Sequence, residues 1–242
     1  MRRNNLLILT FLNFCIAPAA LLLFAACDDG RIEEKKVDFK GGRSVTVKAE
    51  LKGALSWHER YSLAIAGFNE TSDYAEISKV IEPSSDDMQL DITLSGIDTD
   101  VTHVDLCMIN RLRKRIVTFR RIEIEKDKEQ QESNLGTIDV GMFTAIQDNI
   151  FSTTCAACHG ATGNAAASLF LTEGKSRESL VGIQSKKVPT LNRVTPGDSP
   201  NSVLYQTISG DISSTWHYNH SAEITSADMK SLIADWIDNG AK

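Results

Sequence analysis

Apolar and polar residues alternate with a period of two along much of the first half of the chain. Successive side chains of a strand point to opposite faces of a sheet, so this alternation predicts strands that bury one face. Other short runs rich in β-branched and aromatic residues predict strands as well. The strands predicted in these two ways cover residues 45–49, 61–68, 77–81, 88–94, 104–108 and 115–124.

Turn-forming residues separate the predicted strands, for example at residues 83–87 and 95–98. No helical period interrupts this part of the chain. Several short strands with turns between them are typical of a sandwich of two sheets. We therefore predict an all-β immunoglobulin-like sandwich over residues 43–140.

The second half of the chain has apolar residues at helical spacing instead. Met142, Phe143, Ile146 and Ile150 lie on one face of a predicted helix. Shorter helices are predicted near residues 175–181 and 201–208. A last helix is predicted to start at a cap formed by Thr225, with an apolar stripe of Met229, Leu232, Ile233, Trp236 and Ile237. Residues 141–242 are therefore expected to form an all-α domain.

The N-terminus has the regions of an export signal. Arg2 and Arg3 precede an apolar run over residues 6–26, which ends in Ala25-Ala26-Cys27. The segment resembles a bacterial lipoprotein signal, which implies that residues 1–26 are removed and that Cys27 carries the lipid. An uncleaved membrane helix is the alternative. Either way the rest of the chain is exported, to the periplasmic or the cell-surface side of a membrane.

Composition and charge bound the remaining possibilities. The formal net charge is −6, and acidic residues outnumber basic ones in both halves, which makes nucleic acid an improbable partner. The polar stretch over residues 27–42 is expected to be a tether between the lipid anchor and the sandwich. The remaining chain is long enough for two small domains.

The most specific motif is Cys155-Ala-Ala-Cys158-His159, which has the Cys-x-x-Cys-His pattern of covalent haem attachment. Two intervening residues bring both sulfurs to one side of a helical turn, where each can form a thioether to a haem vinyl group. The adjacent imidazole of His159 then reaches the iron. The motif predicts haem c as the cofactor.

Two other interpretations of this motif are weaker. A zinc site would need further ligands, which His217 and His220 could supply, but zinc does not require a His directly after the second Cys. A thioredoxin-like redox pair would need a strand before the motif and a βαβ pattern around it. The motif instead follows a predicted helix and precedes a Gly-rich segment.

One cysteine is left without a role. Cys15 lies in the signal, Cys27 would be lipidated, and Cys155 and Cys158 would hold haem, so Cys107 remains. Its place in a predicted strand favours a buried free thiol.

Residues 141–242 resemble the small monohaem class I cytochrome c domains that bacteria append to exported proteins. Besides the haem motif, the segments that carry this resemblance are residues 193–198, 202–205 and 236–241. The resemblance implies an all-α cytochrome c fold, with His159 as one axial ligand of the iron. It does not extend to residues 37–140.

The chain departs from this family at the sixth iron ligand, where such domains usually place a Met before the last helix. This chain has Trp216-His217-Tyr218-Asn219-His220 there. We expect His217 as the ligand because it falls nearest to the usual Met position, with His220 and Met229 as weaker alternatives. Met229 belongs to the apolar stripe of the last helix, and an open iron site is also possible.

The main hypothesis is a lipid-anchored c-type cytochrome that carries electrons between redox partner proteins at the membrane and has no catalytic residues. One alternative is a binding or adhesion sandwich with an accessory haem domain. Another is an open-site haem protein that binds small ligands or has peroxidase-like activity. The basic run from Arg111 to Arg121 is either a docking patch for acidic groups or a solvated hairpin.

Overall fold

The structure is a computed structural model, and it describes residues 42–160, 165–212, 216 and 218–242. All of these residues belong to one compact unit that spans Phe39–Lys242. The expected signal (residues 1–26), the lipidated Cys27 and all of the tether except Gly42 lie outside the described residues. Within the described residues, no helix is both long enough and apolar enough to cross a membrane.

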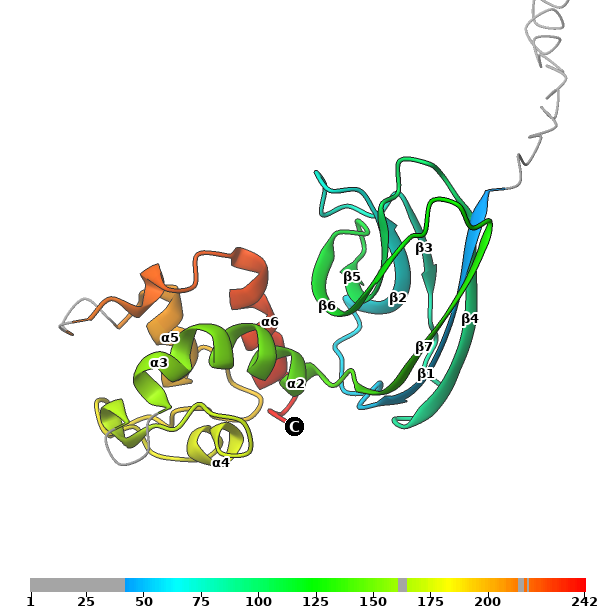
Figure 1. Ribbon diagram of the computed structural model, residues 1–242. Helices are drawn as coiled ribbons and strands as arrows, with labels where there is room; N and C mark the ends of the chain where they lie inside the picture. The colour runs from blue at the N-terminus through cyan, green and yellow to red at the C-terminus, as the bar shows by residue number, and fades with distance from the viewer. Residues whose placement is uncertain (1–41, 161–164, 213–215, 217) are drawn as a thin grey trace, which may run out of the picture. The chain divides into compact units, whose positions relative to one another are not determined.

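Seven strands form two sheets in the first part of the unit (Figure 1). One sheet has the order β4-β1-β7 and the other has the order β3-β2-β5-β6. All neighbours are antiparallel except β1 and β7, which run parallel. The strands are β1 (Arg43–Lys52), β2 (Tyr61–Phe68), β3 (Ile77–Val80), β4 (Met88–Ile97), β5 (His103–Asn110), β6 (Arg115–Glu123) and β7 (Gln130–Asp139).

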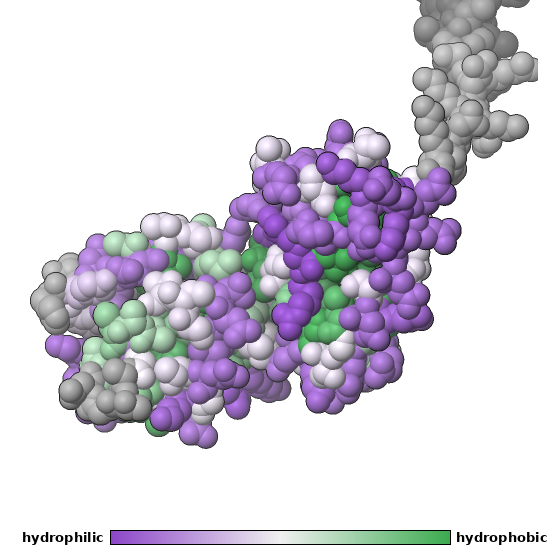
Figure 2. Space-filling view, viewed as in Figure 1, coloured by the Kyte–Doolittle hydropathy of each residue, from purple (hydrophilic) through white to green (hydrophobic). Residues whose placement is uncertain are grey.

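The alternating pattern explains how these strands bury one face. In β1, Val45, Val47, Ala49 and Leu51 are buried, and the residues between them are partly exposed. By contrast, β5 is buried almost throughout, because a second small apolar cluster around Phe68 and Cys107 adds to the main core. On the face shown in Figure 2, hydrophilic residues cover most of the strand-rich part, with hydrophobic residues visible between them.

The predicted immunoglobulin-like arrangement is wrong. A constant-type immunoglobulin sandwich places its first, second, fourth and fifth strands in one sheet and its third, sixth and seventh in the other. Here the first, fourth and seventh strands share a sheet, and the second, third, fifth and sixth share the other. Periodicity shows which residues form strands, but it holds no information about which strands become neighbours.

The predicted all-α cytochrome c domain is also wrong, because the unit as a whole is of mixed α and β structure and its helices are short. Among the helices that the structure describes, only α6 (Ala227–Asp238) reaches 12 residues. Isolated bridges pair Val181 with Val194 and Gln184 with Asn192 between the short helices. The other helical elements are α2 (Met142–Ile146), η1 (Gln147–Cys155), α3 (Ala156–His159), η2 (Ala166–Ser168), α4 (Ser176–Leu180), α5 (Val203–Ser209) and η4 (His220–Ala222).

The elements α2, η1 and α3 follow one another as a continuous helical rod, with α6 beside α2 (Figure 1). The side chain that caps α6 is Ser226, which accepts a hydrogen bond from the Met229 amide, and not Thr225 as the sequence predicts. A single apolar cluster joins the strands to this helical part and includes Leu106, Phe151 and Trp236.

Polar contacts also join the strands to the helical part. The Tyr61 hydroxyl donates to Asp235 Oδ2 on α6 at 2.6 Å, and both residues are buried. Trp57 Nε1 donates to the Val140 carbonyl at 2.6 Å, just before α2. These contacts therefore hold the helical part, which carries the Cys-x-x-Cys-His motif, against the strands.

Candidate functional site

The Cys-x-x-Cys-His motif lies at the end of the helical rod. Cys155 is the last residue of η1, and α3 consists of Ala156–His159. The spacing of three residues places Cys155 and Cys158 on one face of the helix. Cys155 is partly buried and Cys158 is exposed, and both are free thiols in this structure. Both cysteines and His159 line the same cavity.

A buried glutamine on the rod fixes the chain that follows the motif. Gln147 Nε2 donates to the Leu171 carbonyl at 3.1 Å, and the Ser176 hydroxyl donates to Gln147 Oε1. These contacts tie the start of η1 to the loop before α4. The segment η1 is a π-helix of nine residues, a helix type that is rare in proteins. The sequence analysis assigned no role to Gln147, whose burial depends on contacts with distant residues.

The cavity has a volume of about 460 Å³, within the range typical of sites for small molecules and cofactors. Most of its exposed lining surface is apolar, and charged side chains, among them Lys186, Lys187, Arg193 and Glu223, also line it. The larger aliphatic side chains on its walls are Leu169, Leu171, Leu180, Val203, Leu204, Ile208 and Ile224.

The imidazole of His159 is held in a defined orientation. Its Nδ1 lies 3.0 Å from the Ala166 carbonyl oxygen, which can only accept, so Nδ1 carries the proton. Nε2 is then the nitrogen with a lone pair available for a metal. Burial lowers the pKa of His159, which favours the neutral imidazole that a metal requires.

A second histidine faces His159 across the site. The ring centres of His159 and His220 are 6.1 Å apart, and the rings are inclined by 28°. Two imidazoles that bind one metal ion from opposite sides, each at ~2.0 Å from the ion, have ring centres roughly 6 Å apart. The observed distance between the ring centres is close to this value.

Aromatic side chains surround His220. Trp216 and Tyr218 meet its ring edge to face, with ring centres 5.9 and 5.0 Å away. The Tyr218 hydroxyl donates to Glu223, which fixes the loop before α6. These contacts restrict the positions that the His220 imidazole can adopt.

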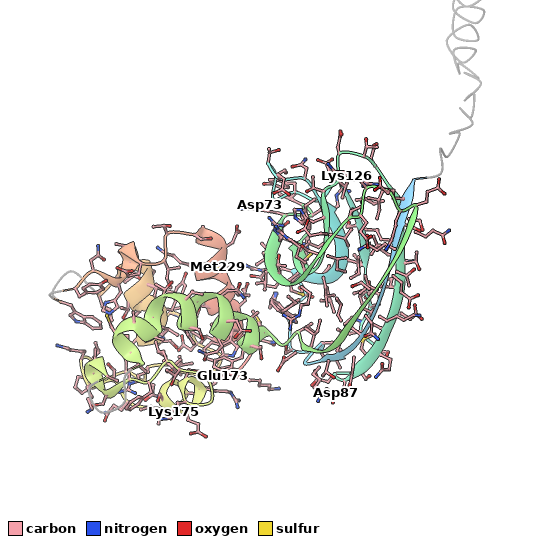
Figure 3. The ribbon with its side chains drawn as sticks, viewed as in Figure 1. Asp73, Asp87, Lys126, Glu173, Lys175 and Met229 are labelled. Carbon is pink, nitrogen blue, oxygen red and sulfur yellow. The ribbon has the colours of Figure 1, made fainter. Side chains whose placement is uncertain are left out.

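Of the other two candidates for the sixth ligand, the structure describes Met229. His217 is outside the described residues. Met229, labelled in Figure 3, is on α6, where it packs against the main core and does not line the cavity. Of the two candidates that the structure describes, His220 is the one that lies next to His159.

The surroundings of Cys155 fit a thioether better than a thiolate. Burial raises the pKa of Cys155 to about 11, because the apolar surroundings disfavour a charged sulfur. Zinc ligands and redox-active cysteines act as thiolates, whereas a thioether carries no charge. Among the residues that the structure describes, no three or more His, Cys, Asp or Glu side chains cluster as a metal site.

Arg193 is a basic group on the cavity wall for which the sequence alone predicts no role. Arg193 lines the cavity and is only 8% exposed. Its guanidinium donates to the carbonyls of Ser179, Ala167 and Ser168 at 2.8, 3.0 and 3.3 Å. In the sequence, the one indication of a role for Arg193 is its place in a segment that resembles the cytochrome c family. Its hydrogen-bond partners lie 14 to 26 residues away in the sequence, so local patterns do not reveal them.

Among the described strands, Cys107 and part of the basic run from Arg111 to Arg121 contribute to the fold rather than to a second cavity-lined site. Cys107 is fully buried in β5, as expected, and burial raises its pKa. Asp105, also fully buried, binds two members of the basic run, Arg115 at 2.8 Å and Arg121 at 3.3 Å. Part of that run therefore serves the fold, while Arg111 and Arg113 are exposed at the β5–β6 turn.

Comparison of this chain with models of known protein families, with curated proteins and with solved structures found no match.

Proposed function

We propose that this chain is a lipid-anchored c-type cytochrome that carries electrons through one covalently bound haem, although its fold is not the all-α fold of class I cytochromes c. The observation that supports it best is the pair of imidazoles, His159 and His220, whose ring centres are 6.1 Å apart beside an apolar cavity lined by both cysteines of the motif.

Each residue of the site has one role in this proposal. Cys155 and Cys158 form the two thioethers, and His159 is the axial ligand beside them. His220, rather than His217, is the second axial ligand. The bound haem supplies an iron that accepts and releases one electron. The apolar part of the cavity wall would limit the access of water, and the imidazoles of His159 and His220 would both hold the iron.

The axial pair also predicts the direction of the reduction potential. A second imidazole stabilises ferric iron more than a thioether sulfur does, so the potential lies below that of cytochromes with His and Met ligands. An iron with both axial positions filled passes electrons without binding a substrate, which favours an electron carrier over a peroxidase.

The proposal includes export and anchoring. The protein would be attached through Cys27 to a membrane, on the periplasmic or cell-surface side, and would exchange electrons with redox partner proteins there. Haem attachment to Cys-x-x-Cys-His motifs takes place outside the bacterial cytoplasm, which agrees with the export signal in the sequence.

The axial ligand is tested by comparing His220→Met with His217→Met in haem-loaded protein. A Met-ligated ferric haem has a weak far-red charge-transfer band, which a haem with two imidazole ligands lacks. We expect no band in the wild-type protein, a band and a higher potential in His220→Met, and a wild-type spectrum in His217→Met. The reverse result for the two variants would assign the ligand to His217, and a high-spin wild-type spectrum would contradict both.

A further inference from the structure

A turn with unfavourable backbone geometry carries the carbonyl that orients His159. Ala167 and Ser168 have φ angles of 55° and 51°, in the left-handed region that residues other than glycine seldom adopt. In this region Cβ comes too close to the following carbonyl oxygen, so each of the two residues is less stable than in an ordinary conformation. Such geometry persists only where surrounding contacts enforce it.

Arg193 supplies such contacts. Its Nη2 donates to the carbonyls of Ala167 and Ser168, the two residues with positive φ, and its Nη1 donates to the Ser179 carbonyl. The planar guanidinium therefore links the turn to the end of α4. The backbone of Arg193 is itself fixed, because its amide donates to the Ile183 carbonyl at 2.7 Å and its carbonyl accepts from the Leu204 amide at 2.9 Å.

The same turn holds the imidazole. Ala166 directly precedes the two strained residues, and its carbonyl accepts the Nδ1 proton of His159 at 3.0 Å. If Ala167 relaxed to an ordinary φ, the peptide between Ala166 and Ala167 would rotate and its carbonyl would leave the ring. A hydrogen bond at this nitrogen fixes the orientation of a ligating imidazole and makes it a stronger donor to the metal.

We propose that Arg193 is a positioning residue for His159: its guanidinium holds Ala167 and Ser168 in the left-handed conformation and thereby keeps the Ala166 carbonyl on Nδ1 of the imidazole. The effect on the iron rests on the proposed function, but the effect on the His159 ring does not. Arg193 then influences the potential through the backbone of the turn as well as through its charge.

The substitution Arg193→Lys separates these two effects. Lysine keeps the positive charge but loses the planar fork that binds several carbonyls at once. Loss of the Nδ1 hydrogen bond weakens the imidazole as a donor, so ferric iron is less stabilised and the potential rises. Lys187→Gln is the matched control, because Lys187 also lines the cavity but its side chain makes no hydrogen bond to the turn among the described residues. Lys187→Gln removes a positive charge from the cavity wall, which stabilises the ferric state, so this control is expected to lower the potential, opposite to the rise expected for Arg193→Lys.

The direct measurement is solvent exchange of the His159 Nδ1 proton by NMR, on protein with ¹⁵N-labelled histidine, in the reduced state if haem is bound. We expect exchange to be about tenfold faster in Arg193→Lys, the factor that corresponds to one hydrogen bond of ordinary net strength. Exchange of the Val194 amide, which donates to the Leu180 carbonyl, should not change, because general unfolding is not the cause.

A rescue variant tests the role of backbone strain. Glycine adopts positive φ without a steric penalty, so Ala167→Gly and Ser168→Gly together should restore slow Nδ1 exchange in the Arg193→Lys background. If Arg193→Lys alone does not fold, Nδ1 exchange is measured in this triple variant instead.

Unchanged Nδ1 exchange and potential in a folded Arg193→Lys protein would overturn the proposal, as would a folded rescue variant with fast exchange. If the wild-type protein binds no haem, the proposed function fails, but the exchange measurements still decide the role of Arg193.

Discussion

The hydrogen bond between Tyr61 and Asp235 offers a test of how far the strands and the helical part depend on each other. The Tyr61 hydroxyl donates to Asp235 Oδ2 at 2.6 Å, and the two residues are 9% and 7% exposed. Tyr61→Phe removes this donor and leaves the carboxylate with Arg60, which lies 3.2 Å away but is half exposed.

A hydrogen bond to a charged group contributes ~1.5–3 kcal/mol, and the remaining contact with Arg60 offsets part of the loss. We therefore expect the free energy of unfolding to fall by about 2 kcal/mol. For a chain of this size, that change lowers the melting temperature by about 4–8 °C.

The assay is denaturant unfolding followed both by tryptophan fluorescence and by far-ultraviolet circular dichroism. We expect both signals to report one transition, shifted to lower denaturant in Tyr61→Phe. Tyr74→Phe is the matched control, because Tyr74 is 50% exposed and its change should cost less than about 0.5 kcal/mol. If Tyr61→Phe loses no more stability than this control, or if the helical part unfolds in a separate transition, the hydrogen bond between Tyr61 and Asp235 does not couple the strands to the helical part.

Three further predictions follow from individual groups. Burial raises the pKa of Tyr61 above its ordinary value of 10.0, so above pH 10 the tyrosine ionises only in the unfolded state. The wild-type protein should therefore lose stability as the pH rises above 10, and Tyr61→Phe should lose less. An equal dependence of the unfolding free energy on pH in the two proteins would refute this. The buried Cys107 thiol, whose pKa is also raised, should resist alkylation in a folded variant that lacks Cys155 and Cys158, and should react once urea is added; equal rates in both conditions would contradict its burial. Labelled fatty acid should enter the wild-type protein but not Cys27→Ser, and equal labelling would exclude Cys27 as the anchor.

Local patterns in the sequence located several elements well. The strand predicted over residues 61–68 is β2, and the apolar stripe of the last helix is the buried face of α6, apart from the partly exposed Met229. The strand β7 was missed, because its sequence is polar and most of its side chains are at least partly exposed. It forms through backbone pairing with β1, which side-chain periodicity does not report.

The contacts that shape the site were harder to predict than the site's attachment motif. The spacing of Cys155, Cys158 and His159 is local, so the sequence contains it. Counting residues points to His217, which lies outside the described residues and stays a prediction, whereas the described structure places His220 beside His159. The proximity of His220 depends on the path of the chain between α5 and α6. Arg193 acts on a turn 25 to 26 residues earlier in the chain, so only the folded structure shows its partners.

The most direct test of the proposed function is whether haem stays on the polypeptide under denaturing conditions. Protein exported from a host with haem-attachment machinery is extracted with acidified acetone and run on a denaturing gel that is stained for haem. We predict a stained band at the mass of the protein, which disappears when Cys155 and Cys158 are both replaced by Ala. A wild-type protein that carries no haem, or that loses it on extraction, would contradict covalent attachment and with it the proposal of a c-type cytochrome.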